Sequence, residues 1–272
     1  YVKFILIHLI LAIIIGVYVF PVYWTLTTSL KTVPEMMSWT PTWFSHKIVL
    51  THYINVLENS KYLYYLKNSI VISSLVTILT LILAVSASFS LSRLRLWGKG
   101  LLSQLILLVY LFPGIVLTIP IFQIMSKIGL YNNLVSVVIV HMLFTLPFSV
   151  WTLRNFFNKI AIDLDDAARI DGANDIVILY KIHLPLIAPG LATVAIFSYV
   201  ISWNEYMFPL ILLAEPEKQT IPVGIAGWVC AYNIDWGLIS AAAILTLIPT
   251  TIFFLFLGKH FVKGLSAGGV KG

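Results

Sequence analysis

Six long apolar stretches, separated by polar segments, alternate along the 272 residues of the chain. A helix needs about 20 mostly apolar residues to cross a bilayer, and each stretch is long enough. The pattern therefore predicts an all-α membrane protein, with a single transmembrane domain over residues 1–272. The first stretch is too long for a signal-peptide core, so it is counted as a span. The expected spans lie at about 4–26, 69–91, 101–122, 134–153, 186–213 and 238–257.

The composition indicates that lipid solvates most of the chain. Hydrophobic residues make up 60% of it, and Asp, Glu, Lys and Arg only 10%. Soluble globular domains have about 45–50% apolar residues and about 25% charged residues. A soluble domain and a disordered chain are therefore excluded. The single cysteine, Cys230, also excludes a disulfide framework.

Prolines inside the apolar stretches predict breaks in the spans. A proline removes one backbone donor, and the freed carbonyl must find a partner in a neighbouring helix or in water. Such breaks favour a bundle that forms a pathway over a plain anchor. The positions are Pro113, Pro120, Pro147, Pro189 and Pro209.

Basic residues predict the direction of the spans. Eleven of the 17 Lys and Arg residues lie on the side that holds both termini and the loops 92–100 and 154–185. By the positive-inside rule, this side is cytoplasmic. The outer side then holds the loops 29–66 and 214–237. The net charge of +6 is dispersed and builds no basic groove, so nucleic acid is not an expected partner, whereas membrane lipid is.

The inner loop, residues 154–185, begins with a predicted short helix. Asp163 is expected to cap this helix. Asp165 and Asp166 suit its first turn, where acidic side chains complement the helix dipole. Gly172 is expected to interrupt the helix with a bend, because glycine adopts backbone conformations that other residues avoid.

A second short helix is predicted directly after this bend. Asn174 or Asp175 can cap its start, and it is expected to run over 176–182 until Pro185 stops it. Two interpretations of the helix pair stay open. It is either a small-residue surface that docks on another protein, or an amphipathic pair that lies on the bilayer. The five aspartates of the loop count against the second interpretation, because anionic headgroups repel them.

Three short motifs in this loop match a known pattern. They are Asp166-Ala167-Ala168, Asp171-Gly172-Ala173 and Ile182-His183-Leu184-Pro185. On these residues the sequence resembles the EAA loop of ABC importer permeases. One position departs from the pattern, because Asp166 stands where the family usually has Glu. The charge is kept, and the pairing of the shorter carboxylate stays open.

Two further segments resemble carbohydrate importers in particular. The run Ser202-Trp203-Asn204-Glu205-Tyr206 looks like the Trp-Asn-Glu-Tyr stretch of their permeases. Residues 263–272, in the tail 258–272, are similar to the tail of the smaller maltose-importer permeases. Together the motifs cover nearly the whole chain. They imply a type I importer permease with six spans, in the cytoplasmic (inner) membrane of a bacterium or archaeon.

The resemblance also implies partners and a mechanism. The inner loop would be a coupling helix that sits in a cleft of a cytoplasmic ATPase. A second homologous permease, two ATPases and an external solute-binding protein would complete the complex. It would carry a carbohydrate, an oligosaccharide or sugar derivative, into the cell by alternating access. The coupling role falls on Asp166, Ala167, Ala168, Asp171, Gly172 and Ala173.

Catalytic and metal chemistry are not expected in the chain itself. It has no GxxxxGK[ST] loop, so ATP and Mg are expected on the separate ATPase chains. The six histidines are scattered and predict no metal cluster. The inner-loop histidine, His183, is expected to have a docking or structural role.

Glu205 is the one carboxylate that falls within an expected span. An ionisable residue inside a membrane is a functional candidate by default, so Glu205 and its neighbour Asn204 are expected in the substrate pathway. Trp203 and Tyr206 are further candidates, because sugars stack on aromatic faces. The alternatives stay open: Glu205 is hydrated at the outer interface, or the aromatics belong to an interfacial belt.

The outer loop 214–237 is the candidate contact with the binding protein. By position it corresponds to a loop that reaches into the binding protein in maltose importers. Glycines and bulky residues suit a flexible probe, although a loop that packs on the partner permease fits equally well. The candidate residues are Gly224, Gly227, Trp228 and Tyr232.

Three alternative functions remain. An importer permease for a non-sugar solute shares the same inner-loop motif. A secondary transporter would place ionisable residues at the midplane, where this chain offers little besides Glu205. A scaffold that transports nothing would need neither broken spans nor a docking loop.

Overall fold

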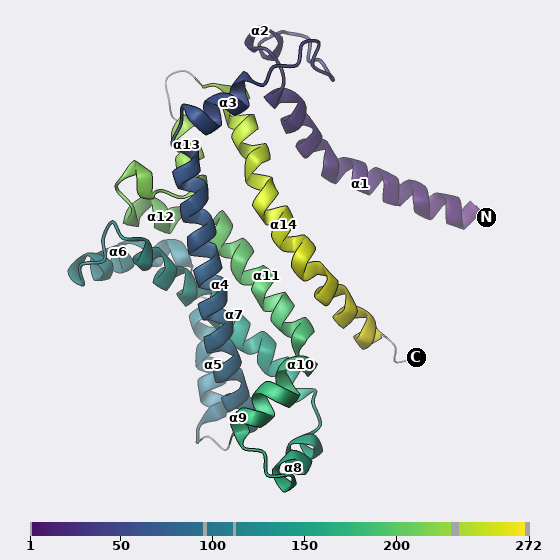
Figure 1. Ribbon diagram of the computed structural model, residues 1–272, viewed down its shortest axis with the longest axis vertical. Coiled ribbons are helices and arrows are strands. Elements are labelled where there is room, and N and C mark those ends of the chain that lie inside the picture. The colour runs from purple at the N-terminus through teal and green to yellow at the C-terminus, as the bar shows by residue number, and fades with distance from the viewer. Residues whose placement is uncertain (1, 95–96, 111–112, 230–233, 270–272) are drawn as a thin grey trace. The chain divides into compact units, whose positions relative to one another are not determined.

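The computed structural model describes residues 2–94, 97–110, 113–229 and 234–269, and these residues form helices joined by loops (Figure 1). The elements in the first half of the chain are α1 (Val2–Ser29), α2 (Val33–Met36), α3 (Thr51–Glu58), α4 (Tyr62–Arg93), α5 (Lys99–Tyr110), η1 (Gly114–Leu117), α6 (Thr118–Lys127) and α7 (Leu134–Asn158). Those in the second half are α8 (Ile162–Ile170), α9 (Asp175–Val177), η2 (Ile178–His183), α10 (Leu184–Leu186), α11 (Ala188–Asn204), α12 (Met207–Leu212), η3 (Pro216–Lys218), α13 (Ile221–Val229) and α14 (Trp236–Gly269).

The apolar stretches of the sequence become long helices at four places. Within the described residues, α1, α4, α7 and α14 are each long and apolar enough to cross a membrane. A fifth crossing is reached if Asp175–Leu186 and α11, which meet at 79°, are counted as one span. The remaining expected crossing, the third stretch at 101–122, is not one continuous helix but is divided into α5, η1 and α6. The number of crossings therefore stays a prediction.

The prolines account for some of these interruptions. Pro113 directly precedes η1, and its missing N–H helps to keep α5 from continuing. Pro189 lies in the first turn of α11, where no intrahelical donor is needed. The predicted break at Pro147 is wrong, because α7 continues through this residue. The fifth stretch is broken instead at Glu205, between α11 and α12.

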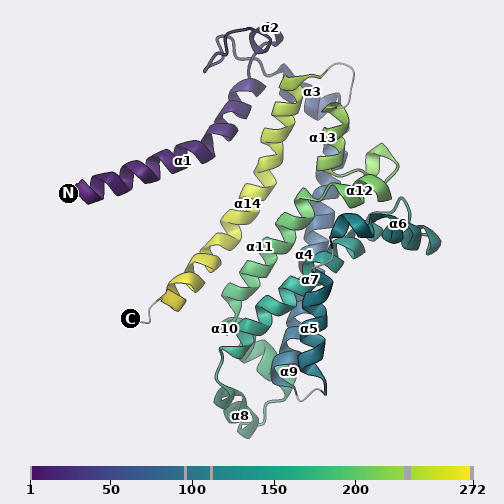
Figure 2. The same cartoon turned by 180° about the vertical axis from the view of Figure 1, so that it is seen from behind.

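The chain divides into two compact units. One comprises Lys67–Gln219 with Thr250–Gly272, and α7 lies at its centre. Both α5 and α11 pack along α7, as Figures 1 and 2 show. Two apolar clusters fill this unit, and each joins α4 to α7. Polar side chains cross the same interior: His141 Nδ1 lies 2.8 Å from Ser202 Oγ.

The other unit comprises Tyr1–Leu66 with Thr220–Pro249. Its apolar cluster joins α3 and the start of α4 to α14, around Val56, Tyr62, Ala241 and Ala242. The apolar side chains of α1 are exposed over most of its length, as expected of a helix solvated by lipid.

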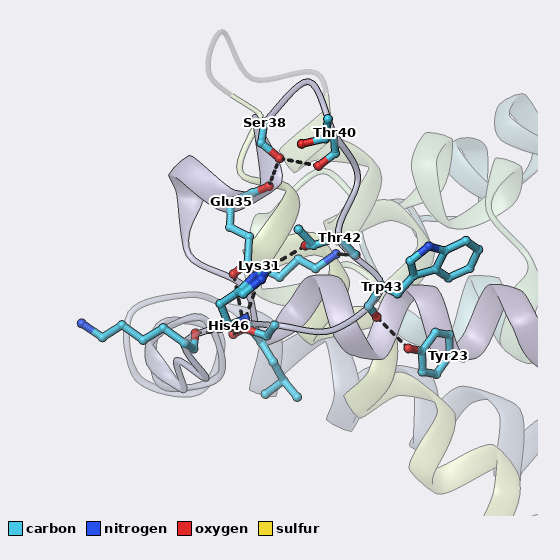
Figure 3. Close-up of polar contacts among 11 residues, drawn as sticks. Tyr23, Lys31, Glu35, Ser38, Thr40, Thr42, Trp43 and His46 are labelled. Atoms are coloured by element: carbon cyan, nitrogen blue, oxygen red, sulfur yellow. Dashed lines mark hydrogen bonds and ion pairs between the residues drawn. The ribbon is translucent and has the colours of Figure 1, made fainter.

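A polar network closes the segment 31–49 of this unit, which we call the outer strap. The carboxylate of Glu35 accepts hydrogen bonds from the His46 backbone N–H (3.0 Å), the His46 ring (2.9 Å) and the Thr42 hydroxyl (3.0 Å). The Lys31 ammonium donates to the Thr42 carbonyl (Figure 3). The strap is therefore held by a network of backbone, hydroxyl, imidazole and ammonium groups.

Candidate functional site

The first helix of the inner loop is α8, and its ends follow from local chemistry. Asp163 lies in the first turn, so the prediction that it caps the helix is wrong; Ala161 holds that position without a side-chain bond. At the other end Gly172 has a φ of +85°, a left-handed conformation that favours glycine. The Ala173 N–H donates to the Ala168 carbonyl over 2.9 Å, which completes a helix-ending turn of the Schellman type. The predicted bend at Gly172 is confirmed.

The second half of the loop is one helical segment, Asp175–Leu186, with a widened turn inside it. Asn174 caps its start by accepting a hydrogen bond from the Val177 N–H over 2.9 Å, as predicted. Pro185 does not stop the helix, so that prediction is wrong. A π-helical turn, η2, precedes the proline and accommodates a ring that would clash with the carbonyl four residues earlier in a regular α-helix.

One side of α8 is open to its surroundings. The side chain of Asp166 is 63% exposed, and the alanine that follows it is also exposed. Ile170 is 87% exposed, and other large apolar side chains of the loop share this exposure. Arg169 donates to Asp175 over 2.9 Å across the Gly172 bend, and this hydrogen bond is the main cause that raises the pKa of Arg169. Of the predicted coupling residues, Ala168 and Ala173 are partly exposed and the other four are exposed, on a surface that carries both small and apolar side chains.

The opposite side of α8 is fixed to the bundle by a buried ionic cluster. Asp165 Oδ1 accepts a hydrogen bond from His183 Nε2 over 2.7 Å. Asp165 Oδ2 lies 3.3 Å from Arg93 Nε at the end of α4. All three side chains are at most 6% exposed. Arg93 Nη2 also donates to the carbonyls of Phe157 (2.8 Å) and Ile160 (2.7 Å) at the end of α7. The cluster therefore joins α4, α7 and both halves of the inner loop.

The predicted pathway residues surround the break that separates α11 from α12. Glu205 Oε1 accepts hydrogen bonds from the N–H groups of Met207 (2.8 Å) and Phe208 (3.2 Å), so Glu205 caps the start of α12. Asn204 and Tyr206 are exposed, whereas Trp203 is buried. The four residues are consecutive around the break, and Trp203 is the one whose side chain is buried in the protein interior.

The predicted outer contact residues belong mostly to a helix, α13. Gly224 is buried, and a Cβ atom at this position would lie 2.1 Å from the Tyr65 ring. Gly227 is exposed and has open space beside it, and Trp228 packs near Tyr65 with ring centroids 6.4 Å apart. Tyr232 lies outside the described residues. Three of the four candidates therefore lie on a helix, and their contact with a binding protein stays a prediction.

No group of three or more His, Cys, Asp and Glu side chains in the described part of the chain is arranged to hold a metal ion. The exposed side of α8 offers a surface to another molecule, and the buried cluster behind it connects this surface to α4 and α7.

Comparison with known proteins decides the family. The family described as "Binding-protein-dependent transport system inner membrane component" matches residues 76–267, well over half of the chain. The chain belongs to this family. Members are inner-membrane permease subunits of ABC importers, which work with separate ATPase subunits.

Individual relatives extend the likeness to almost the full length. The sulfoquinovosyl glycerol transport system permease protein SmoH of Agrobacterium fabrum is 36% identical, over 93% of this chain and 89% of the relative. The trehalose/maltose transport system permease protein MalG of Thermococcus litoralis is also 36% identical, over 93% and 91%. A chain in the crystal structure of a bacterial ABC transporter involved in alginate import has a TM-score of 0.84 at 24% identity, with 96% of each chain covered. That last likeness establishes the type I permease fold.

Sequence reasoning about this permease missed the buried cluster. It attributed Arg93 to membrane orientation and Asp165 to the helix dipole, and it left His183 between docking and structure. Arg93 and Asp165 are 72 positions apart, and no local pattern joins them. The one available signal was that Asp165 and Asp166, as neighbours on a helix, must point to different sides.

Proposed function

We propose that this permease carries a carbohydrate into the cell, driven by two ATPase subunits, one of which docks on its inner loop. The exposed surface of α8 is the observation that supports this most directly. Large apolar side chains such as Ile170 are costly to leave in water and favour a protein partner. The family supplies that partner, because its members work with separate ATPases. The carbohydrate class is supported by relatives named for sulfoquinovosyl glycerol and for trehalose and maltose.

The docking residues are the exposed members of the inner-loop motif. Asp166 offers an exposed carboxylate that lies 3.8 Å from Arg169 Nη1, and Ala167 and Ala168 leave room for a close approach by the ATPase. Asp171, Gly172 and Ala173 form the bend that gives the loop its shape. Closure of the ATPases on ATP would push this surface, and the permease would change between inward-facing and outward-facing states.

The break at Glu205 is the proposed contact with the substrate. Asn204 and Tyr206 are exposed there, and a broken helix leaves carbonyl groups that can accept hydrogen bonds from sugar hydroxyls. Glu205 Oε1 is occupied by the cap of α12, and among the described residues Oε2 accepts no hydrogen bond. Trp203 is buried and would support this wall rather than touch the sugar.

The outer end of the permease is the proposed contact with the binding protein. Gly227 and the partly exposed Trp228 lie on α13 and are suited to touch another protein. Gly224 has a packing role instead, because its hydrogen atom faces the Tyr65 ring. A second permease subunit completes the pathway in this proposal.

The test is affinity purification of the permease from its native membranes, followed by assays of the purified complex. We expect two ATPase copies and a second permease to copurify, and uptake of radiolabelled trehalose or maltose into proteoliposomes to require ATP and the binding protein. Asp166→Lys should release the ATPases. Glu58→Lys, a charge reversal at an exposed residue of α3, is the matched control and should retain them.

Two results would contradict the proposal. A permease that purifies without ATPases and transports on an ion gradient alone would be a secondary transporter. A complex that contains the ATPases but imports a non-sugar solute, and none of the sugars, would keep the docking role and remove the carbohydrate.

A further inference from the structure

The buried cluster of Arg93, Asp165 and His183 has a role that docking alone does not give it. We propose that these three are positioning residues, which form the joint that passes movement of the inner loop to α4 and α7. This inference rests on the proposed function. It concerns the side of the loop that faces away from the docking surface, and none of its three residues is expected to touch an ATPase.

The first step in the argument is that the cluster joins the two halves of the loop to each other. Asp165 belongs to α8, before the Gly172 bend, and His183 belongs to η2, after it. Their 2.7 Å hydrogen bond spans the bend. A push on α8 therefore moves the second half of the loop as well, instead of being absorbed by rotation at Gly172.

The second step is that the cluster fixes the loop to two long helices. Arg93 is the last residue of α4, and its guanidinium holds Asp165 and the carbonyls at the end of α7 at once. The His183 ring lies between Phe89 of α4 and Phe157 of α7, with centroids 5.5 Å and 5.4 Å away. Both α4 and α7 are candidate membrane spans, so a displacement of the joint reaches the membrane-spanning part of the permease.

The third step is that burial of the cluster makes partial separation of its members unfavourable. His183 is completely buried, and Asp165 and Arg93 are nearly so. Separating the charges of Arg93 and Asp165 without water to replace the partner is strongly unfavourable. The four elements are thus expected to move together as one body, which is what a transmitting joint requires.

Substitution of Asp165 by Asn tests this role. The amide keeps the shape and an acceptor for His183 but loses the charge that holds Arg93. In purified complexes in proteoliposomes, with trehalose or maltose and the binding protein present, we expect the number of sugar molecules imported per ATP hydrolysed to fall at least tenfold. Asp163→Asn removes the same charge from an exposed position two residues away and should leave this ratio within twofold of the wild type.

A second variant separates transmission from folding. The triple change Arg93→Leu, Asp165→Leu and His183→Phe replaces the ionic cluster by apolar side chains, an exchange that buried ion pairs often tolerate. We expect the complex to assemble with its ATPases and to show the same loss in the ratio. The proposal is overturned if either variant imports as many sugar molecules per ATP as the wild type, or if uptake and hydrolysis fall in equal proportion.

These outcomes are distinct from failure of the proposed function. If the wild-type complex imports no sugar or contains no ATPase, the proposed function fails before any variant is compared. If the wild type imports sugar and Asp165→Asn does so equally well per ATP, only the joint is wrong.

Discussion

Two carboxylates of this permease, Glu35 and Asp165, each hold a loop together through several polar partners. The two groups of partners differ in how far they are exposed to solvent. Glu35 closes the outer strap with hydrogen bonds from His46 and Thr42, and the His46 side chain is 78% exposed. Asp165 holds the inner loop through Arg93 and His183, and no member of that group is open to solvent. The Glu35 side chain is itself only 11% exposed, but its His46 partner is open to water, whereas every partner of Asp165 is buried. Loss of one partner is therefore expected to cost less at Glu35 than at Asp165.

The largest effect is expected where the buried cluster loses one member. Arg93→Leu leaves Asp165 buried without its cation and removes the donors to Phe157 and Ile160. Breaking a buried pair in this way costs about 3–5 kcal/mol. Chemical denaturation of the purified permease in mild detergent should show a loss of this size. A loss of unfolding free energy below about 1 kcal/mol would mean that the buried Arg93–Asp165 pair contributes no more to stability than an exposed ion pair.

A smaller effect is expected in the unit that contains α13, Tyr1–Leu66 with Thr220–Pro249, where close packing rather than charge holds this helix. Gly224→Ala places a methyl group against the Tyr65 ring, and overpacking of this kind costs about 1–3 kcal/mol. Gly227→Ala, three residues along the same helix, has open space and should stabilise the helix by up to about 1 kcal/mol. The same denaturation measurement checks both variants. Equal effects at the two positions would contradict the packing of Gly224.

The smallest effect is expected at the outer strap, and it depends on pH. Several hydrogen bonds lower the pKa of Glu35 from 4.5 to about 2, and the one from the His46 side chain has the largest effect. The carboxylate therefore stabilises the strap fully above about pH 4.5, and this contribution is lost as the pH falls toward 2.

Hydrogen exchange at the His46 amide measures this loss. After correction for the intrinsic rate, exchange in the wild type should become faster as the pH is lowered through that range. Glu35→Gln should exchange faster than the wild type at pH 6 and show no such dependence on pH. A wild-type rate that does not change between pH 5 and pH 3 would mean that ionisation of Glu35 does not stabilise the strap.

The parts that the sequence predicts well are those set by neighbours along the chain. Apolar runs predict α1, α4, α7 and α14, and the left-handed glycine and the asparagine cap of the inner loop follow from single residues. The break at Glu205 was not predicted, because it depends on a carboxylate that folds back on the two N–H groups beyond it. The joint was not predicted either, because Arg93, Asp165 and His183 meet only after α4, α7 and the loop have packed.

The cap at Glu205 also bears on how the permease is made. A carboxylate that enters lipid during membrane insertion is costly when its charge has no partner. Glu205 carries its own donors, the Met207 and Phe208 N–H groups, within three residues of itself. The segment can therefore leave the insertion machinery with this acid already solvated by its own backbone, before any partner subunit arrives.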